Sequence, residues 1–567
     1  MKNIHSLLSL IATILLLSNG TPTISASETD KDPVLNSIQK EIQRNMEGLK
    51  LAHVVSPCFI DYRMNTLSLL VVKAVLGSLV YDNIGEANNG TANVVVGDYQ
   101  NTNQNVLLSY EQLYQHEQPS RMVNGTNDEA IRTEIWRVLD KKYKQAAEQY
   151  NNKQSLINQI EIPEEEKNIP DFQKMTASTH IYPVHQQQPD RKKISEYIKE
   201  ASKVFADYKN IDNSYIRIYI GDADVRYCNS EGTICRYSNK LVLMFIYTQA
   251  QTKDGETINY EASMPYSSFE DLPSLESLKA ICKKQAEFIQ EIQNAPMIDE
   301  PYVGPVLFEG EAVADLICNL FVNNNNGIIA KRKPILSERF KGYDSERTRG
   351  NALDAFINKK VISRDLSLIV MSGTPEYKDK KLFGYYPVDA QGVAPDKACT
   401  LIKDGVLIDM LTSRTPTKSF SQSNGHARSS IGGNDAGIYP GVLRLCSKQT
   451  EPVSQLKQKL INAAKEEDYA YAYIIRKLNA NTPIQIRQIN VTTGTETPIR
   501  GAVIQDLLLR SMKRISGVSS EENIYNRVVN DVKTSYIVPS AILLDEVDIL
   551  KNTRIDFKKP YIVSRPE

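Results

Sequence analysis

The feature that most constrains the fold is a short apolar run that breaks directly into an amphipathic helix, at residues 302–316. Val303–Phe308 is predicted to form a strand, and a glycine then marks a turn. Ala312, Leu316 and Leu320 recur at helical spacing after that turn. The pattern therefore predicts a strand, a turn and a helix in immediate succession.

Two carboxylates, Glu309 and Glu311, lie at this junction. The first turn of a helix offers free N–H groups and the positive end of the helix dipole, so a strand-to-helix junction is a common place for a catalytic residue. The alternative is that the two carboxylates only favour the start of the helix. Spacing alone leaves both interpretations open.

The same segment resembles the central motif of the TldD/PmbA family of metallopeptidase relatives. The active TldD branch carries H-E-x-x-x-H at the start of a helix, where two His bind zinc or iron and the Glu polarises a metal-bound water. Here Phe308 stands for the first His, Glu309 for the Glu and Ala312 for the second His. The PmbA branch, a partner subunit, also lacks both imidazoles. The resemblance makes Glu309 a catalytic candidate by motif position only, and it predicts neither a bound metal nor another cofactor.

Other segments carry the resemblance through the C-terminal half. Residues 386–395 and 400–407 are similar to a D-x-x-G-V … L-I-x-x-G-x-L block, and residues 423–428 take the place of an S-x-G-x-x-R loop. The metal-binding branch has a Cys ligand near its C-terminus, and this chain has Pro539-Ser540-Ala541 there. His426 is the one His in a matching segment, and a single His without further ligands favours loop packing over metal binding.

The resemblance implies an α+β fold in two domains. A mixed α/β N-terminal domain is expected at residues 33–296, with a polar, solvated connection near 151–190, and a β-rich, metallopeptidase-like domain at residues 297–567. Two His in the connection, His180 and His185, are expected at the surface because their spacing suits neither one helix face nor one strand face. The implied assembly is a dimer around an internal cavity in which active members cut peptides.

Residues 1–26 have the pattern of a signal peptide. Lys2 supplies a positive start, Leu7–Leu17 is apolar, and Ile24-Ser25-Ala26 offers a small-residue cleavage site. This apolar stretch is much shorter than the roughly 20 residues that span a bilayer. We therefore expect an exported protein, periplasmic or secreted, with no transmembrane anchor after cleavage. This agrees with a resemblance to a secreted, mostly bacterial branch of the family.

Charge and cysteine content narrow the functional classes. The formal net charge is −1 over 567 residues, so there is no basic field that would favour nucleic acid. Seven Cys without a C-x-x-C pair argue against a structural zinc site. Cys228 and Cys235 flank an Asn-Ser-Glu-Gly turn and are a candidate disulfide in an oxidising compartment. The alternative is two thiols packed as small apolar residues.

Two functions from different classes follow. One is a metal-free partner or pseudo-peptidase subunit of a proteolytic system, which handles unfolded peptides as a homodimer or in a heterodimer with a metal-binding TldD-type paralogue. The alternative is an active metallopeptidase with a non-standard metal site. The sequence favours the first, because Phe308 places apolar bulk where a ligand is expected.

Overall fold

A computed structural model describes residues 32–566 apart from 53, 111, 113–118, 323–326, 341, 344–350, 434, 506, 560, 562 and 564. The predicted signal peptide lies outside these residues. No helix in the described part is long and apolar enough to span a membrane.

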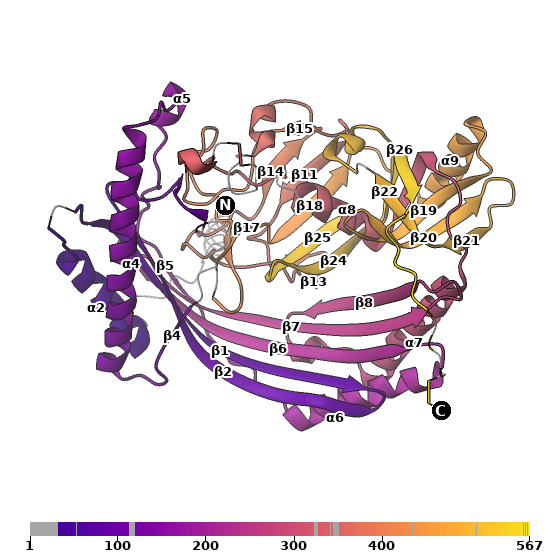
Figure 1. Ribbon diagram of the computed structural model, residues 1–567, viewed down its shortest axis with the longest axis horizontal. Helices are drawn as coiled ribbons and strands as arrows, with labels where there is room; N and C mark the ends of the chain where they lie inside the picture. The colour runs from indigo at the N-terminus through magenta and orange to yellow at the C-terminus, as the bar shows by residue number, and fades with distance from the viewer. Residues whose placement is uncertain are drawn as a thin grey trace, which may run out of the picture.

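The N-terminal half is built on one curved sheet of long strands, with helices along one of its faces (Figure 1). Its helices are α2 (Pro33–Gly48), α4 (Asp128–Ile157), α5 (Glu164–Lys167), α6 (Arg191–Ser202) and α7 (Leu275–Asn294), with 3-10 turns η2 (Lys203–Asp207) and η3 (Phe269–Asp271). Its strands are β1 (Pro57–Val75), β2 (Ser78–Val96), β3 (Val106–Leu107), β4 (Ser120–Arg121), β5 (Thr179–Ile181), β6 (Asn213–Asn229), β7 (Ile234–Gln251) and β8 (Thr257–Tyr266).

The strand order in this sheet is β4-β2-β1-β6-β7-β5, and β8 pairs with β7. Successive side chains of each strand point to opposite faces of the sheet, so the two faces have different neighbours. Residues such as Leu70 and Val72 of β1 pack with α6 and α7 in one buried cluster, and Ile60 and Tyr62 pack with α2 and α4 in another. The opposite face is turned toward the C-terminal half.

The C-terminal half contains two large sheets, and the two-stranded sheets β12-β13 and β16-β17 besides. Its helices are α8 (Glu311–Phe321) and α9 (Val453–Glu466), with 3-10 turns η4 (Glu338–Phe340), η5 (Ala352–Phe356) and η6 (Leu509–Lys513). Its strands are β9 (Tyr302–Glu309), β10 (Ile335–Leu336), β11 (Leu366–Val370), β12 (Glu376–Tyr377), β13 (Lys380–Lys381), β14 (Cys399–Lys403), β15 (Val406–Leu407), β16 (Ala427–Ser429), β17 (Asp435–Ile438), β18 (Val442–Ser447), β19 (Tyr471–Asn479), β20 (Thr482–Asn490), β21 (Glu496–Ile499), β22 (Ala502–Gln505), β23 (Ile515–Val518), β24 (Glu522–Val529), β25 (Val532–Pro539) and β26 (Ala541–Lys551).

One of the large sheets has the order β15-β14-β11-β18-β25-β24, and the other has the order β21-β20-β19-β9-β26-β22, with β23 beside β26. Helix α8 contributes most of its residues to the large apolar cluster shared by both sheets, and α9 packs against β9, β19 and β26 in a separate cluster. The expected α+β fold, with a β-rich C-terminal half, is confirmed.

The pairing register of β6 and β7 does not place the two Cys of the candidate disulfide opposite each other. Cys228 pairs with Ile234 and Cys235 with Tyr227, so the two Cys are offset by one residue across the hairpin. Since neighbouring residues of a strand point to opposite faces, Cys228 packs toward the helices and Cys235 packs with Val388 on the other face. Both thiols are free and buried.

One expectation about local structure needs correction. The connection near 151–190 is not solvated throughout, because α4 continues to Ile157 and both Asp171 and Phe172 are only 3% exposed. The segment between β22 and β23 contains the short 3-10 turn η6. Strands β1 and β2 form one long hairpin, which turns at residues 76 and 77.

Candidate functional site

The strand-to-helix junction forms as the sequence predicts. Strand β9 ends at Glu309, Gly310 follows with a φ of 68° and a ψ of −129°, and α8 begins at Glu311. This backbone conformation is open to glycine and strained for other residues, which explains the glycine at the turn. The N–H of Gly310 donates to the carbonyl of Ser540, 2.8 Å away, so the segment 539–541 lies beside the start of α8.

The residues at the two expected His positions belong to the core. Phe308 and Ala312 both have an exposed fraction of 0% and lie in the main apolar cluster. A six-residue motif that starts at Phe308 ends at Val313, one residue beyond Ala312, and Val313 is equally buried. The motif can also be aligned two residues later, and this second frame fits the local structure better because the helix starts at Glu311. The first His then corresponds to Gly310, the Glu to Glu311 and the second His to Asp315.

Glu309, the catalytic candidate, is held in ion pairs on the side of β9. Its carboxylate lies 2.7 Å from Nε of Arg476 and 3.4 Å from Nζ of Lys457. Both cations also pair with Glu496. Glu309 is absent from the lining of the cavity described below. Its surroundings are those of a surface salt-bridge network.

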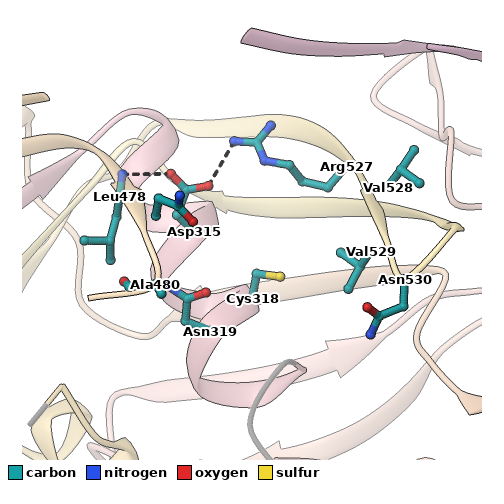
Figure 2. Close-up of a pocket in the computed structure, with 10 residues that line it drawn as sticks. Asp315, Cys318, Asn319, Leu478, Ala480, Arg527, Val528, Val529 and Asn530 are labelled. Atoms are coloured by element: carbon teal, nitrogen blue, oxygen red, sulfur yellow. Dashed lines mark hydrogen bonds and ion pairs between the residues drawn. The ribbon is translucent and has the colours of Figure 1, made fainter. Parts of the chain in front are cut away.

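The two carboxylates on α8 that face the neighbouring strands are Glu311 and Asp315, one helical turn apart. Glu311 pairs with Lys477 of β19 and with Arg527 of β24, at 2.5 and 3.2 Å. Asp315 pairs with the same Nη2 of Arg527 at 3.2 Å and accepts the backbone N–H of Leu478 at 3.1 Å. Figure 2 shows Asp315 held between Leu478 and Arg527.

Burial and these cations set the charge states of the two carboxyls. Burial raises the pKa of Glu311, but Lys477 and Arg527 outweigh it, so the pKa lies below its ordinary value. Burial raises the pKa of Asp315, and Arg527 offsets this only in part. The cluster is therefore a set of carboxylates neutralised by side-chain cations.

A cavity of about 430 Å³ opens next to this cluster. It is lined by Asp315 and Cys318 of α8, by Arg527 of β24 and by the turns after β19 and β24 (Figure 2). Glu311, Asp315 and Cys318 follow one another at helical spacing, a signal that the sequence did contain. Lys477 and Arg527 gave no local signal, because they lie more than 160 residues away along the chain.

The side chains around this cavity do not fit a zinc or iron ion. An ion would need free carboxylate or thiolate electron pairs, whereas Lys477 and Arg527 direct their N–H groups at Glu311 and Asp315. Among the described residues, no group of three or more His, Cys, Asp or Glu side chains could hold a metal ion.

His426 lies away from this cavity in a buried network of its own. Its Nε2 is 3.1 Å from Oγ of Ser372 and its Nδ1 is 2.9 Å from Oδ1 of Asn424. Burial, with a contribution from Arg428, lowers the pKa of His426 to about 3, so the imidazole is neutral. Because Ser372 is fully buried and also accepts the N–H of Gly441, we assign this network to loop packing.

His180 and His185 also lie outside the cavity. His180 is in the short strand β5, which pairs with β7, and it is partly buried, which lowers its pKa. His185 is exposed, as expected. Neither lines the cavity beside α8.

Comparison with known families gives the identity of the fold. Models of the PmbA/TldA metallopeptidase family match residues 184–290 as the central domain and residues 301–551 as the C-terminal domain. The chain belongs to the PmbA/TldD family. The two matches together cover more than half of the chain, and they meet near the expected domain boundary at Pro296.

Solved structures of this family share the fold at low identity. A protein described as a modulator of a DNA gyrase from Thermotoga maritima aligns over 90% of this chain and 100% of its own, with a TM-score of 0.57 and 14% identity. TldE from Thermococcus kodakarensis aligns over 90% of this chain and 99% of its own, with a TM-score of 0.53 and 12% identity. A further protein described as a modulator of DNA gyrase, from Bacteroides thetaiotaomicron, aligns over 91% of this chain and 98% of its own, with a TM-score of 0.54 and 10% identity. No curated protein matches the chain.

The ion pairs of Glu311 give a testable dependence of stability on pH. Because the folded-state pKa lies below the ordinary value of 4.5, the stabilisation is present above 4.5 and is lost as the pH falls through the folded-state pKa. Lys477→Met should therefore destabilise the protein most near neutral pH, and the difference from wild type should shrink in acid. Urea unfolding at a series of pH values measures this.

The matched control is Lys418→Met, which removes an exposed cation whose partner Glu165 is also exposed. This variant should differ little from wild type at any pH. If the free energy of unfolding lost in Lys477→Met stayed constant from neutral pH to below pH 4.5, Glu311 would not depend on Lys477 for its charge.

Proposed function

We propose that this PmbA/TldD protein is a metal-free subunit of a proteolytic system that handles unfolded peptides without cutting them. The observation that carries the proposal is the pairing of Glu311 and Asp315 with Lys477 and Arg527. In active relatives a metal supplies positive charge next to the carboxylates, and here the two cations supply it. These cations cannot lower the pKa of a bound water as zinc does.

The burial of Phe308 supports the same proposal. In the first frame of the motif it stands where the first imidazole is expected, and it is packed in the apolar core. In the second frame the first position is Gly310, which has no side chain. Either frame lacks the nitrogen ligands that the resemblance to the TldD branch would require.

We further propose that the subunit works as a homodimer or with a metal-binding TldD-type paralogue, outside the cytoplasm. The partner supplies the cutting site in the second arrangement, and this chain supplies peptide-binding surface. The proposed export rests on residues 1–26 of the sequence. The alternative, an active metallopeptidase with a non-standard site, would have to displace Lys477 and Arg527 before Glu311 or Asp315 could bind an ion.

A peptidase assay with co-purified partners tests the proposal. The purified chain should not cleave an unfolded peptide, whether or not zinc is added, while a complex with a TldD-type chain that carries an intact H-E-x-x-x-H should cleave it and should lose this activity with a chelator. Glu311→Gln in this chain should leave the activity of the complex unchanged. Chelator-sensitive cleavage by this chain alone, abolished by Glu311→Gln, would contradict the proposal.

A further inference from the structure

Two cationic residues, Arg428 and Lys533, are neighbours where the C-terminal half faces the long sheet. Arg428, in β16, is only 7% exposed, and its guanidinium lies over the ring of Tyr386 at 3.7 Å from the centroid. Its Nη2 is 3.5 Å from the carbonyl of Lys533 in β25. Nζ of Lys533 donates to the carbonyl of Lys240 in β7, 3.0 Å away, so the pair bridges the two halves.

Arg428 has fewer hydrogen-bond partners than its burial requires, and Lys533 beside it is partly buried. Nη1 of Arg428 is buried and makes no hydrogen bond. Lys533 has three N–H groups, and one acceptor is present, the carbonyl of Lys240. Among the described residues, the carboxylates that act on these cations, Asp389 on Arg428 and Asp222 on Lys533, do so through space only. Burial lowers the pKa of Lys533 to about 8 and also lowers that of Arg428.

The nearby carboxylates are committed elsewhere. Asp389 accepts the backbone N–H groups of residues 391, 393 and 427. Asp222 accepts the N–H of Gln187 and the hydroxyl of Ser238. Both attract the cations at longer range without pairing with them. Because a buried cation without a paired anion is costly, the guanidinium of Arg428 lacks the anionic partner that its burial favours.

We propose that Arg428 and Lys533 form an anion-binding site that takes a carboxylate or phosphate group between the two halves of the molecule. The planar guanidinium, with one N–H-bearing nitrogen unpaired, suits the oxygens of such a group, and the ammonium adds a point charge. The anion can come from two sources, the C-terminal carboxylate of a peptide or free phosphate. The site stands independently of the proposed absence of a metal beside α8.

Equilibrium dialysis of the full-length chain with radiolabelled inorganic phosphate tests the site, with chloride at matched ionic strength in every sample. Wild type should bind phosphate saturably, and Arg428→Met and Lys533→Met should each weaken binding at least about tenfold, since each removes a charge-assisted hydrogen bond. The matched control, Arg514→Met, removes an exposed cation paired with Glu546 and should leave the affinity unchanged.

Competition by two forms of one peptide distinguishes the sources. A peptide with a free C-terminal carboxylate that displaces phosphate, when its amide does not, identifies the carboxylate as ligand, and displacement by neither identifies the free anion. Thermal unfolding with and without phosphate is the second measurement, because a bound anion raises Tm in wild type and not in either Met variant. No saturable binding in wild type, or equal binding in both Met variants, overturns the proposal.

Discussion

Arg414→Ala is expected to lower the free energy of unfolding by about 3–5 kcal/mol, the cost of leaving one partner of a buried ion pair alone. Arg414 is 1% exposed, and its guanidinium lies beside the contacting rings of Phe59 and Phe172, at 4.6 and 4.3 Å from their centroids. Its Nη2 is 2.8 Å from both carboxylate oxygens of Glu231. The pair joins the β6–β7 turn to the C-terminal half, and the substitution leaves Glu231 buried without a cation.

Urea unfolding of Arg414→Ala beside Arg514→Ala measures the effect. Arg514 pairs with Glu546 at 2.7 Å, and both side chains are more than half exposed, so its removal should cost less than about 1 kcal/mol. If both variants lost the same small free energy, Arg414 would not be buried in an ion pair with Glu231 beside the two aromatic rings. Arg414→Lys should fall between wild type and Ala, because a lysine keeps the charge and loses the planar stacking.

Phe308→Ala is expected to cost about 3–5 kcal/mol, the usual cost of truncating a fully buried Phe. The ring has an exposed fraction of 0% in the cluster that α8 shares with both C-terminal sheets. A residue that lined an open metal site would lose less free energy on truncation, because no core cavity would form. The prediction therefore distinguishes a ring that packs in the core from a ring that lines a former metal-binding site.

Val303→Ala in the same strand is the control, since Val303 is 47% exposed and should lose about 0.5 kcal/mol or less. Thermal and urea unfolding of both variants give the comparison. A Phe308→Ala cost near that of Val303→Ala would mean that the ring does not belong to the core, and the interpretation of the motif would have to change.

The sequence predicted the elements whose signals are local. The apolar run at Val303–Phe308, the glycine after it and the helical spacing of Ala312 and Leu316 lie within a few residues of one another, and the structure confirms β9 and α8 there. A local pattern is sufficient where the secondary structure of a segment follows from the hydrophobic periodicity of that segment alone.

The site itself could not be predicted as fully, because its decisive contacts join distant segments. Glu311 meets Lys477 across 166 residues and Arg527 across 216, and no spacing rule links them. The motif position therefore drew attention to Glu309, whereas the structure places Glu311 and Asp315 beside the cavity. The burial of Asp171 and Phe172 was missed in the same way, since their partners include Lys153 and Arg414.

The most direct measurement is the content of zinc and iron per chain, by elemental mass spectrometry, in protein purified without chelators from cells supplied with both metals. If Lys477 and Arg527 neutralise Glu311 and Asp315, the protein should carry far less than one ion per chain, and Glu311→Gln and Asp315→Asn should not change that value. One zinc or iron ion per chain, lost in either variant, would contradict the account.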